Sequence, residues 1–203
     1  KGDEDCGADT FSAGVWEKKG IKKENIFYLP KKNNWWGPAG ITGPCGPDTE
    51  IFFITGKDKC CDECSPACDC GRYVEIWNNV FMEFNKNADG TFSPLAQKNV
   101  DTGMGLERTV AMLNGYESVY DIDVFKPVIE LINAKAGKPE VKATRIIADH
   151  IRTATFMLGD EKGVTPSNVD QGYILRRLIR RAVRFARTIE LDTDVLKEIS
   201  NKY

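Results

Sequence analysis

Apolar positions follow two different spacings along the chain, and the change predicts two structural parts. In the first part, short apolar runs bounded by turn residues predict β-strands over residues 26–29, 50–55 and 73–84. An Asn-Ala-Asp-Gly sequence at 87–90 follows the longest run, and its turn chemistry predicts a hairpin. From residue 124 onward, apolar residues recur at helical spacing, which indicates helices with one buried face.

The predicted helices of the second part cover residues 124–136, 143–158 and 173–189, with a loop at 159–170. The last of these helices is apolar at Ile174, Leu175, Leu178, Ile179, Ala182, Val183 and Ala186. Two shorter helices are expected in the first part, at 11–19 and 106–114. The resulting fold class is α+β.

We therefore expect an antiparallel sheet with flanking helices over residues 1–118, followed by an all-helical section over 119–203, with the boundary near 117–121. A cysteine-rich insertion at 57–71 separates two of the predicted strands.

One loop is predicted to hold a fixed shape. Residues 33–47 contain four glycines and three prolines, which supply tight bends and fixed φ angles. Trp35 and Trp36 lie inside this loop. Large aromatic side chains there form either a hydrophobic plug or a wall for a ligand, and the pattern does not decide between them.

Composition places the chain among ordinary globular proteins, at 41% apolar and 29% charged residues. The net charge of −2 indicates no partner, but residues 171–187 hold six arginines and no acid. No apolar run reaches the roughly 18 residues that a membrane helix needs. The start has neither Met nor an export signal. We therefore expect a cytoplasmic protein, and a piece cut from a longer chain.

The stretch VDTGMGLERTV at residues 100–110 is the strongest candidate site. It predicts a short buried strand, then Gly103 and Gly105, whose backbone lets a phosphate or a base approach closely. Asp101 ends the strand, and Arg108 follows one helical turn later, where it can reach a polyphosphate. Asn78 in the long strand would face the same pocket if the two strands are neighbours.

Five of the seven cysteines lie between residues 60 and 70. The spacing of Cys61, Cys64, Cys68 and Cys70 suits a tetrahedral structural zinc site, with Cys60 as an ambiguous fifth donor. Free thiols and disulfides remain alternatives. Four thiolates leave no open position on the ion, so a catalytic metal is not expected.

The remaining cysteine and histidine candidates favour structural roles. Cys45 in a Gly-Pro-Cys-Gly-Pro sequence is interpreted as a small buried thiol. His150, the only histidine, is interpreted as a packing or hydrogen-bonding residue of a helix. A single histidine also argues against a Ser-His-Asp triad.

An arginine stripe crosses the last predicted helix, and its density suits a phosphate backbone. The alternative is a solvated face balanced by acids elsewhere. Asn168, in the loop before the helix, would either read a base edge or cap the helix. The stripe consists of Arg176, Arg177, Arg180, Arg181, Arg184 and Arg187.

Four motifs in one order resemble the alanyl-tRNA synthetase family of class II. They are TGPCGP at 42–47, VEIWNNVFMEF at 74–84, DTGMGLER at 101–108 and the stretch IADHIRTATFMLGDEKGVTPSNVDQGYILRRLIRRAVR at 147–184. The resemblance covers about residues 35–187 and implies a ligase. Such an enzyme activates alanine with ATP and Mg²⁺ and transfers it to the 3′ end of tRNA(Ala).

The resemblance also implies roles for single residues. Asp101 would hold the α-amino group of alanine, and Asn78 its carboxylate side. Trp36 would help to wall the pocket, although WWGPAG differs from the commonest family loop. Gly103 and Gly105 would line the nucleotide, and Arg108 would grip the phosphates.

In the helical section, the resemblance implies recognition of a G·U pair in the acceptor stem. Asn168 would contact the base pair with Arg180 beside it, and Arg176, Arg177, Arg181 and Arg184 would contact phosphates. The family's first and second motifs and its editing domain are not found here, so we expect this chain alone to be inactive. The competing hypotheses are a non-catalytic tRNA-binding module with a structural zinc, and a zinc-bound DNA-binding protein.

Overall fold

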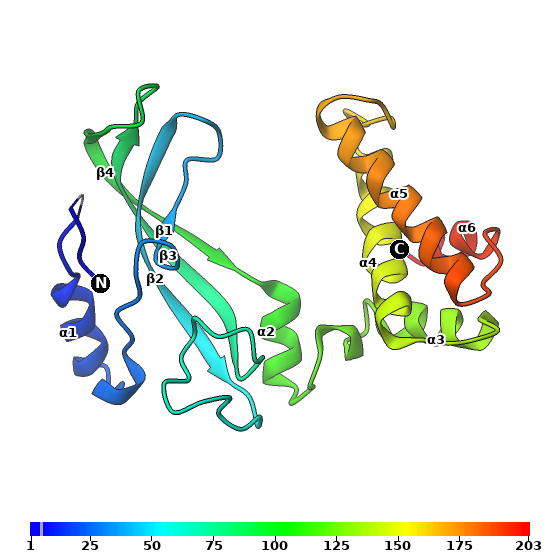
Figure 1. Cartoon of the computed structure of the whole chain (residues 1–203), viewed down its shortest axis with the longest axis horizontal. Coiled ribbons are helices and arrows are strands. Elements are labelled where there is room, and N and C mark those ends of the chain that lie inside the picture. Colours follow the sequence, from blue (N-terminus) through cyan, green and yellow to red (C-terminus); the bar gives the residue numbers. More distant parts are fainter. Residues whose placement is uncertain (5) are drawn as a thin grey trace. The chain divides into compact units, whose positions relative to one another are not determined.

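The computed structural model describes residues 1–4 and 6–203. It divides the chain into two compact units, Lys1–Glu117 and Ser118–Tyr203. The first unit contains a sheet and the second consists of helices (Figure 1).

Four antiparallel strands form the sheet of the first unit, in the spatial order β1-β2-β3-β4. Their bounds are Trp35–Trp36 for β1, Gly43–Ile54 for β2, Tyr73–Lys86 for β3 and Phe92–Met104 for β4. The hairpin predicted between β3 and β4 is confirmed: Asn87 N donates to Thr91 O at 2.8 Å, and Asp89 Oδ1 accepts from Thr91 N at 2.9 Å.

Helices flank this sheet. Helix α1 (Thr10–Lys18) begins after Asp9, whose Oδ1 accepts from Ser12 N at 2.8 Å, a side-chain cap of the helix N-terminus. Its Trp16 Nε1 donates to Thr49 Oγ1 on β2 at 3.1 Å. Helix α2 (Leu106–Leu113) follows β4 directly and buries Ala111 and Met112. The antiparallel sheet with flanking helices confirms the predicted α+β class.

Two predictions for the N-terminal region are wrong. Residues 26–29 form no strand; they follow the 3-10 helix η1 (Lys23–Asn25), and their apolar side chains line a cavity instead of pairing in a sheet. The predicted loop 33–47 contains β1 and the start of β2. Gly46 permits the close approach of β2 to β3, because a Cβ at this position would lie 1.7 Å from Phe81 O.

The strand that contains Asp101 is present, but the prediction that it is buried is wrong. β4 has β3 on one side and is an edge of the four-stranded sheet. Val100 is 60% exposed, and residues 96–104 are all exposed. The VDTGMGLERTV stretch therefore predicted a strand correctly, but that strand is exposed.

The second unit contains the helices η2 (Val119–Asp121), α3 (Lys126–Lys135), α4 (Val141–Gly159), α5 (Asp170–Thr188) and α6 (Val195–Ser200). α4 and α5 pack side by side (Figure 1). Their core includes the fully buried side chains of Ile132, Ile147, Leu175, Ile189 and Ile199. Within the described residues, no helix combines the length and apolar character that crossing a membrane requires.

α5 has the strongest separation of apolar and basic faces. Leu175, Ala182 and Ala186 are buried on one side, in agreement with the predicted apolar positions. Ile174, also predicted to be apolar-facing, is 49% exposed. The first residue of the helix is Asp170, three residues before the predicted start at Tyr173.

Candidate functional site

The sheet register places the two predicted alanine-binding polar residues on one face. Asn78 of β3 pairs with Gly103 of β4, and Val80 pairs with Asp101. Paired residues point to the same side of an antiparallel sheet, so Asn78 and Asp101 are diagonal neighbours on that face. The two strands are therefore adjacent, as the proposed common pocket required.

Carboxylates that the sequence analysis did not select occupy the same face. Glu50 of β2 pairs with Asn78, and Asp48 pairs with Val80. Asn78 Nδ2 donates to Asp48 Oδ2 at 3.4 Å and to Glu50 Oε1 at 3.5 Å. The signal was the two-residue spacing of these acids in a strand, which puts both side chains on one face.

The amide of Asn78 leaves one polar atom without a protein partner. Its Nδ2 is directed at two carboxylates, whereas its Oδ1 is buried and accepts no hydrogen bond among the described residues. Buried polar atoms are normally paired. The Oδ1 atom of Asn78 is therefore an acceptor that the described residues leave unsatisfied, while its Nδ2 already donates to Asp48 and Glu50.

Arg108 approaches this face from α2. Its Nη1 lies 3.3 Å from Glu75 Oε2, with both side chains partly exposed. Gly105 N donates to Ile76 O at 3.1 Å, which fixes the passage from β4 into α2. A Cβ on Gly105 would lie 2.5 Å from Arg108 Nε, so the guanidinium group packs directly over the glycine backbone.

Burial makes this face an unfavourable place for negative charge. The pKa of Glu50 is raised to about 7, first by burial and then by the charges of Asp48 and Glu75, while Arg108 acts in the opposite direction. Burial also raises the pKa of Asp48, against the hydrogen bonds from Asn34 and Asn78 that lower it. A cationic group bound among these carboxylates would be favoured.

Glu50→Gln is expected to stabilise the chain at pH 8 and not at pH 4.5. The raised pKa means that the folded state binds the Glu50 proton more tightly, so its contribution to stability falls as pH rises from about 4.5 to about 7. Because the carboxyl group is half exposed, we expect a gain of about 1 kcal/mol, less than the roughly 3 kcal/mol to which the full pKa shift of Glu50 corresponds. Urea unfolding at both pH values measures it; an equal gain at both would contradict it.

A cavity of about 350 Å³ lies next to this face, between α1, the segment before β1, and β2. Asp48 and Glu50 line it, together with residues such as Trp16, Asn34 and Trp35. Asn78, Asp101, Trp36, Gly103, Gly105 and Arg108 do not line it. The two acids therefore belong both to the cavity and to the face that carries the predicted site.

The two neighbouring tryptophans have different surroundings. Trp35 stacks on Phe84 with ring centroids 5.6 Å apart and meets the edge of Phe92 at 5.3 Å. Lys31 Nζ lies 4.1 Å from both the Trp35 and the Phe92 ring centroids. Trp36 is 42% exposed. Trp35 thus has the contacts of a hydrophobic plug, and Trp36 has the exposure that a ligand wall needs.

The cysteine-rich insertion forms the connection between β2 and β3. Backbone N–H groups of Ser65 and Arg72 lower the pKa of Cys68 and Cys70, respectively.

The other cysteine and histidine candidates are buried. Cys45 is fully buried, and burial raises the pKa of its thiol. His150 is buried on α4, with Nδ1 2.9 Å from Asp149 Oδ2.

The arginines of α5 remain available on the surface of the helical unit. Arg177, Arg180, Arg181, Arg184 and Arg187 are exposed, and Arg176 is half-buried and donates to Asn168 Oδ1. Within residues 1–4 and 6–203, no carboxylate pairs with any of these six guanidinium groups. Balancing acids, the alternative explanation of the stripe, are thus not found there.

Comparison with known proteins matches this amino-acid sequence to one family. The family model described as tRNA synthetases class II (A) matches residues 3–203. Alanine–tRNA ligase from Treponema denticola is 57% identical over 202 residues, which cover 97% of this chain and 34% of the relative. The ligase from Treponema pallidum is 52% identical over 98% of this chain and 34% of its own length.

A more distant relative extends the same comparison. Alanine–tRNA ligase from Petrotoga mobilis is 45% identical over 88% of this chain and 21% of the relative. The chain spans about a third of the length of the most similar of these relatives. Since the family model covers nearly all of its residues, the chain belongs to the class II (A) tRNA synthetase family.

Proposed function

We propose that this chain is the part of an alanine–tRNA ligase that supplies one wall of the alanyl-adenylate site and a tRNA-binding helix. The observation that carries the proposal is the register that sets Asp101 and Gly103 beside Asn78. The names and high identity of the relatives supply the substrate class. A cytoplasmic location remains a prediction.

Alanine would bind through its ammonium group. Asp101 is an exposed carboxylate on the site face, and the free Oδ1 of Asn78 is a second acceptor nearby. Asp48 and Glu50, which accept hydrogen bonds from Asn78 Nδ2, add negative charge on the β2 side of Asn78. A charged ammonium satisfies these acceptors better than a carboxylate does, so we propose the α-amino group for both Asp101 and Asn78. Trp36 remains a proposed wall of the alanine pocket.

ATP would bind over the two glycines and the guanidinium group. Gly103 has nothing within 4 Å of the position of a Cβ, so the backbone is open to a flat base, and Gly105 would line the same ligand. Arg108, which pairs with Glu75 in this structure, would contact the phosphates when ATP is bound. Carboxylate oxygens such as those of Glu50 and Glu75 are ligands that Mg²⁺ accepts, and the ion would offset phosphate charge.

The proposed reaction needs positioning rather than a covalent enzyme intermediate. A carboxylate oxygen of alanine attacks the α-phosphorus of ATP, the new P–O bond forms, and the bond to the pyrophosphate oxygen breaks. Asp101 and Asn78 would orient the amino acid, while Arg108 would stabilise charge on the leaving phosphates. The products are alanyl-adenylate and pyrophosphate.

The helical unit would hold the acceptor stem of tRNA(Ala). The arginine face of α5, which pairs with no carboxylate among the described residues, suits RNA phosphates, and Arg180 would lie near the recognised base pair. Asn168 accepts from Arg176 through Oδ1, so its NH₂ group is the part that would contact a base edge. The alternative is a non-catalytic tRNA-binding module. Such a module would need the arginines of α5 to bind RNA, but it would not need Asp101 and Asn78 to lie on one face of the sheet.

Alanine-dependent ATP–pyrophosphate exchange by this chain alone is expected to be far slower than by a complete alanine–tRNA ligase. The proposed site has one wall here, and a loss of positioning on the other side can remove several kcal/mol of transition-state stabilisation. An exchange assay with the Treponema denticola ligase as reference measures this. A comparable rate would show that the chain carries a complete site.

Gly103→Ala is expected to weaken binding of alanyl-sulfamoyl adenosine, a non-hydrolysable analogue of alanyl-adenylate, by about tenfold or more. The new methyl group meets no protein atom within 4 Å, so the fold tolerates it, but it would occupy the surface proposed for the nucleotide. Isothermal calorimetry measures the affinity. Gly14→Ala, also in open space, is the matched control. Equal affinity of both variants and the unaltered chain would favour the non-catalytic alternative.

A further inference from the structure

The connection between β2 and β3 is closed at its base but has almost no core. Thr55 N donates to Arg72 O at 2.8 Å, and Thr55 Oγ1 donates to Gly71 O at 3.0 Å. Between these contacts, residues 56–72 include one buried side chain, that of Cys64. The segment is otherwise rich in Lys, Asp, Glu, Ser and Pro, which cannot form an apolar cluster.

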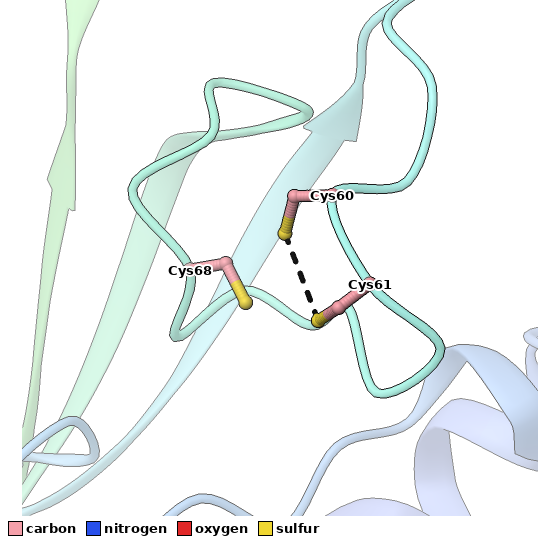
Figure 2. A group of neighbouring side chains, drawn as sticks. All are labelled: Cys60, Cys61 and Cys68. Carbon is pink, nitrogen blue, oxygen red and sulfur yellow. Dashed lines mark hydrogen bonds between the residues drawn. The ribbon is translucent and has the colours of Figure 1, made fainter.

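The structure gathers five cysteine sulfurs within this connection. The Sγ atoms of Cys60, Cys61 and Cys68 all lie within 4.8 Å of one another, and so do those of Cys60, Cys64 and Cys70. Figure 2 shows the first group, with its three thiols directed toward a common space. None of these cysteines forms a disulfide.

Two sulfur pairs have the separation found in a metal–thiolate site, and one of them, Cys64–Cys70, lies within the ligand set proposed below. Cys60 Sγ lies 3.8 Å from Cys61 Sγ, and Cys64 Sγ lies 3.8 Å from Cys70 Sγ. In a tetrahedral zinc site with Zn–S bonds of about 2.3 Å, neighbouring sulfurs are roughly 3.8 Å apart. The turns that create this arrangement are local: Cys64 N donates to Cys61 O at 3.1 Å, and Cys68 N donates to Ser65 O at 3.0 Å.

Cys60 has the central position among the five sulfurs. It belongs to both groups, so it lies within 4.8 Å of each of the other four, whereas Cys61 belongs to only one group. Cys60 and Cys61 are both exposed, while Cys64 is buried and Cys68 and Cys70 are half-buried, so the choice between Cys60 and Cys61 rests on sulfur positions and not on exposure. Cys60 is therefore the sulfur that joins the Cys64–Cys70 pair to Cys68, which is grouped with Cys60 and Cys61 and not with that pair. Binding of all four by one ion requires the Cys68 sulfur to move toward Cys64 and Cys70.

We propose that Cys60, Cys64, Cys68 and Cys70 bind one structural Zn²⁺ ion, with Cys61 outside the ligand set. The proposal exchanges Cys61 of the sequence-based set for Cys60. Four thiolates close the coordination sphere, so the ion has no position for a substrate. This zinc proposal is independent of the proposed ligase function, since it rests on the positions of the sulfur atoms alone.

The ion would fix the start of β3. Tyr73 Oη donates to Cys64 O at 3.4 Å, and Arg72 donates through Nη1 to Lys57 O, so the cysteine loop contacts the first residues of the strand. β3 then carries Glu75 and Asn78. Zinc would supply the free energy that the loop lacks from apolar burial, as in other small metal-stabilised segments.

The test is the metal content of this chain and of two serine variants, purified in reducing buffer without added metal. We expect about one zinc per chain by plasma mass spectrometry in the unaltered protein and in Cys61→Ser. In Cys60→Ser we expect zinc affinity, measured by competition with a chromogenic chelator, to fall at least 100-fold. Cobalt substitution is expected to give the visible d–d bands of tetrahedral thiolate in the unaltered chain and Cys61→Ser, but not in Cys60→Ser.

The remaining outcomes overturn the proposal. Absence of zinc and of cobalt bands from the unaltered, folded chain would remove the site. Loss of metal from Cys61→Ser with retention in Cys60→Ser would transfer the fourth ligand to Cys61 and contradict the assignment. Circular dichroism of each variant shows whether it is folded. For a variant that does not fold, the alanine substitution at the same position of the whole chain gives the same comparison, and equal zinc affinity of the Cys60 and Cys61 variants refutes the choice of Cys60.

Discussion

Asp101→Asn is expected to reduce the affinity of the chain for alanyl-sulfamoyl adenosine by about 10- to 100-fold while leaving its stability unchanged. The substitution removes a negative charge from the proposed ammonium site, and a hydrogen bond to a charged group contributes about 1.5–3 kcal/mol. Asp101 is exposed on the edge strand β4, so the fold does not depend on its carboxylate. Calorimetric titration measures the affinity, and thermal unfolding measures the stability.

The matched control for Asp101 is Asp58→Asn, which removes the same charge from another exposed position of the first unit. A sulfamoyl adenosine without the alanyl group separates the two halves of the ligand, because Asp101→Asn should not weaken its binding. A loss of affinity for both ligands in Asp101→Asn would mean that the residue contacts the nucleotide. No loss for either would remove Asp101 from the site.

Replacing Arg177, Arg181 and Arg184 together by Gln is expected to weaken binding of a tRNA(Ala) acceptor-stem hairpin on the order of 100-fold at physiological salt. These exposed guanidinium groups have no carboxylate partner within residues 1–4 and 6–203, so they can replace the counterions of the phosphates. The slope of log affinity against log salt should become shallower by about 2. Fluorescence anisotropy over a salt series measures both quantities.

Three lysines of the same unit provide the control. Changing Lys126, Lys142 and Lys202 to Gln removes the same net charge without touching α5. If this variant loses as much affinity as the arginine variant, the helical unit attracts RNA through its net charge and α5 has no special role. Retention of the salt slope in the arginine variant would contradict the phosphate contacts proposed for α5.

Local sequence signals predicted the elements whose determinants lie within their own residues. The Asn-Ala-Asp-Gly turn fixed the β3–β4 hairpin, and the apolar spacing of α5 identified its buried Leu175, Ala182 and Ala186. In these cases the signal lies within the element, as turn chemistry or as a face of a helix. Such features need no knowledge of the neighbouring segments.

Other features depend on neighbours that a single segment does not specify. Residues 26–29 have strand composition, but they line the cavity beside β2 instead of joining the sheet. Val100 is predicted to lie in a buried strand, but it is 60% exposed, and β4 has a strand on one side only. Composition records the preference of a residue for burial, whereas its actual burial is decided by which elements pack against it.

The candidate site divides in the same way. Asp101, Asn78, Gly103 and Arg108 could be selected from their motifs, but the contribution of Asp48 and Glu50 follows from the β2–β3 register. The orientation of Asn78, with its Nδ2 on two acids and its Oδ1 free, likewise depends on partners about 30 positions earlier in the chain. It changes the proposed ligand of Asn78 from a carboxylate to an ammonium group.

The most direct test of the proposed ligand site is a map of where alanyl-sulfamoyl adenosine binds, by ¹⁵N chemical-shift perturbation of the whole chain. We expect the largest shifts at the amides of Asn78, Asp101, Gly103 and Gly105, which surround the face formed by β3, β4 and the start of α2. Shifts centred instead on Ser12, Trp16 and Phe27, which line the 350 Å³ cavity, would contradict the account and place the ligand between α1 and β2.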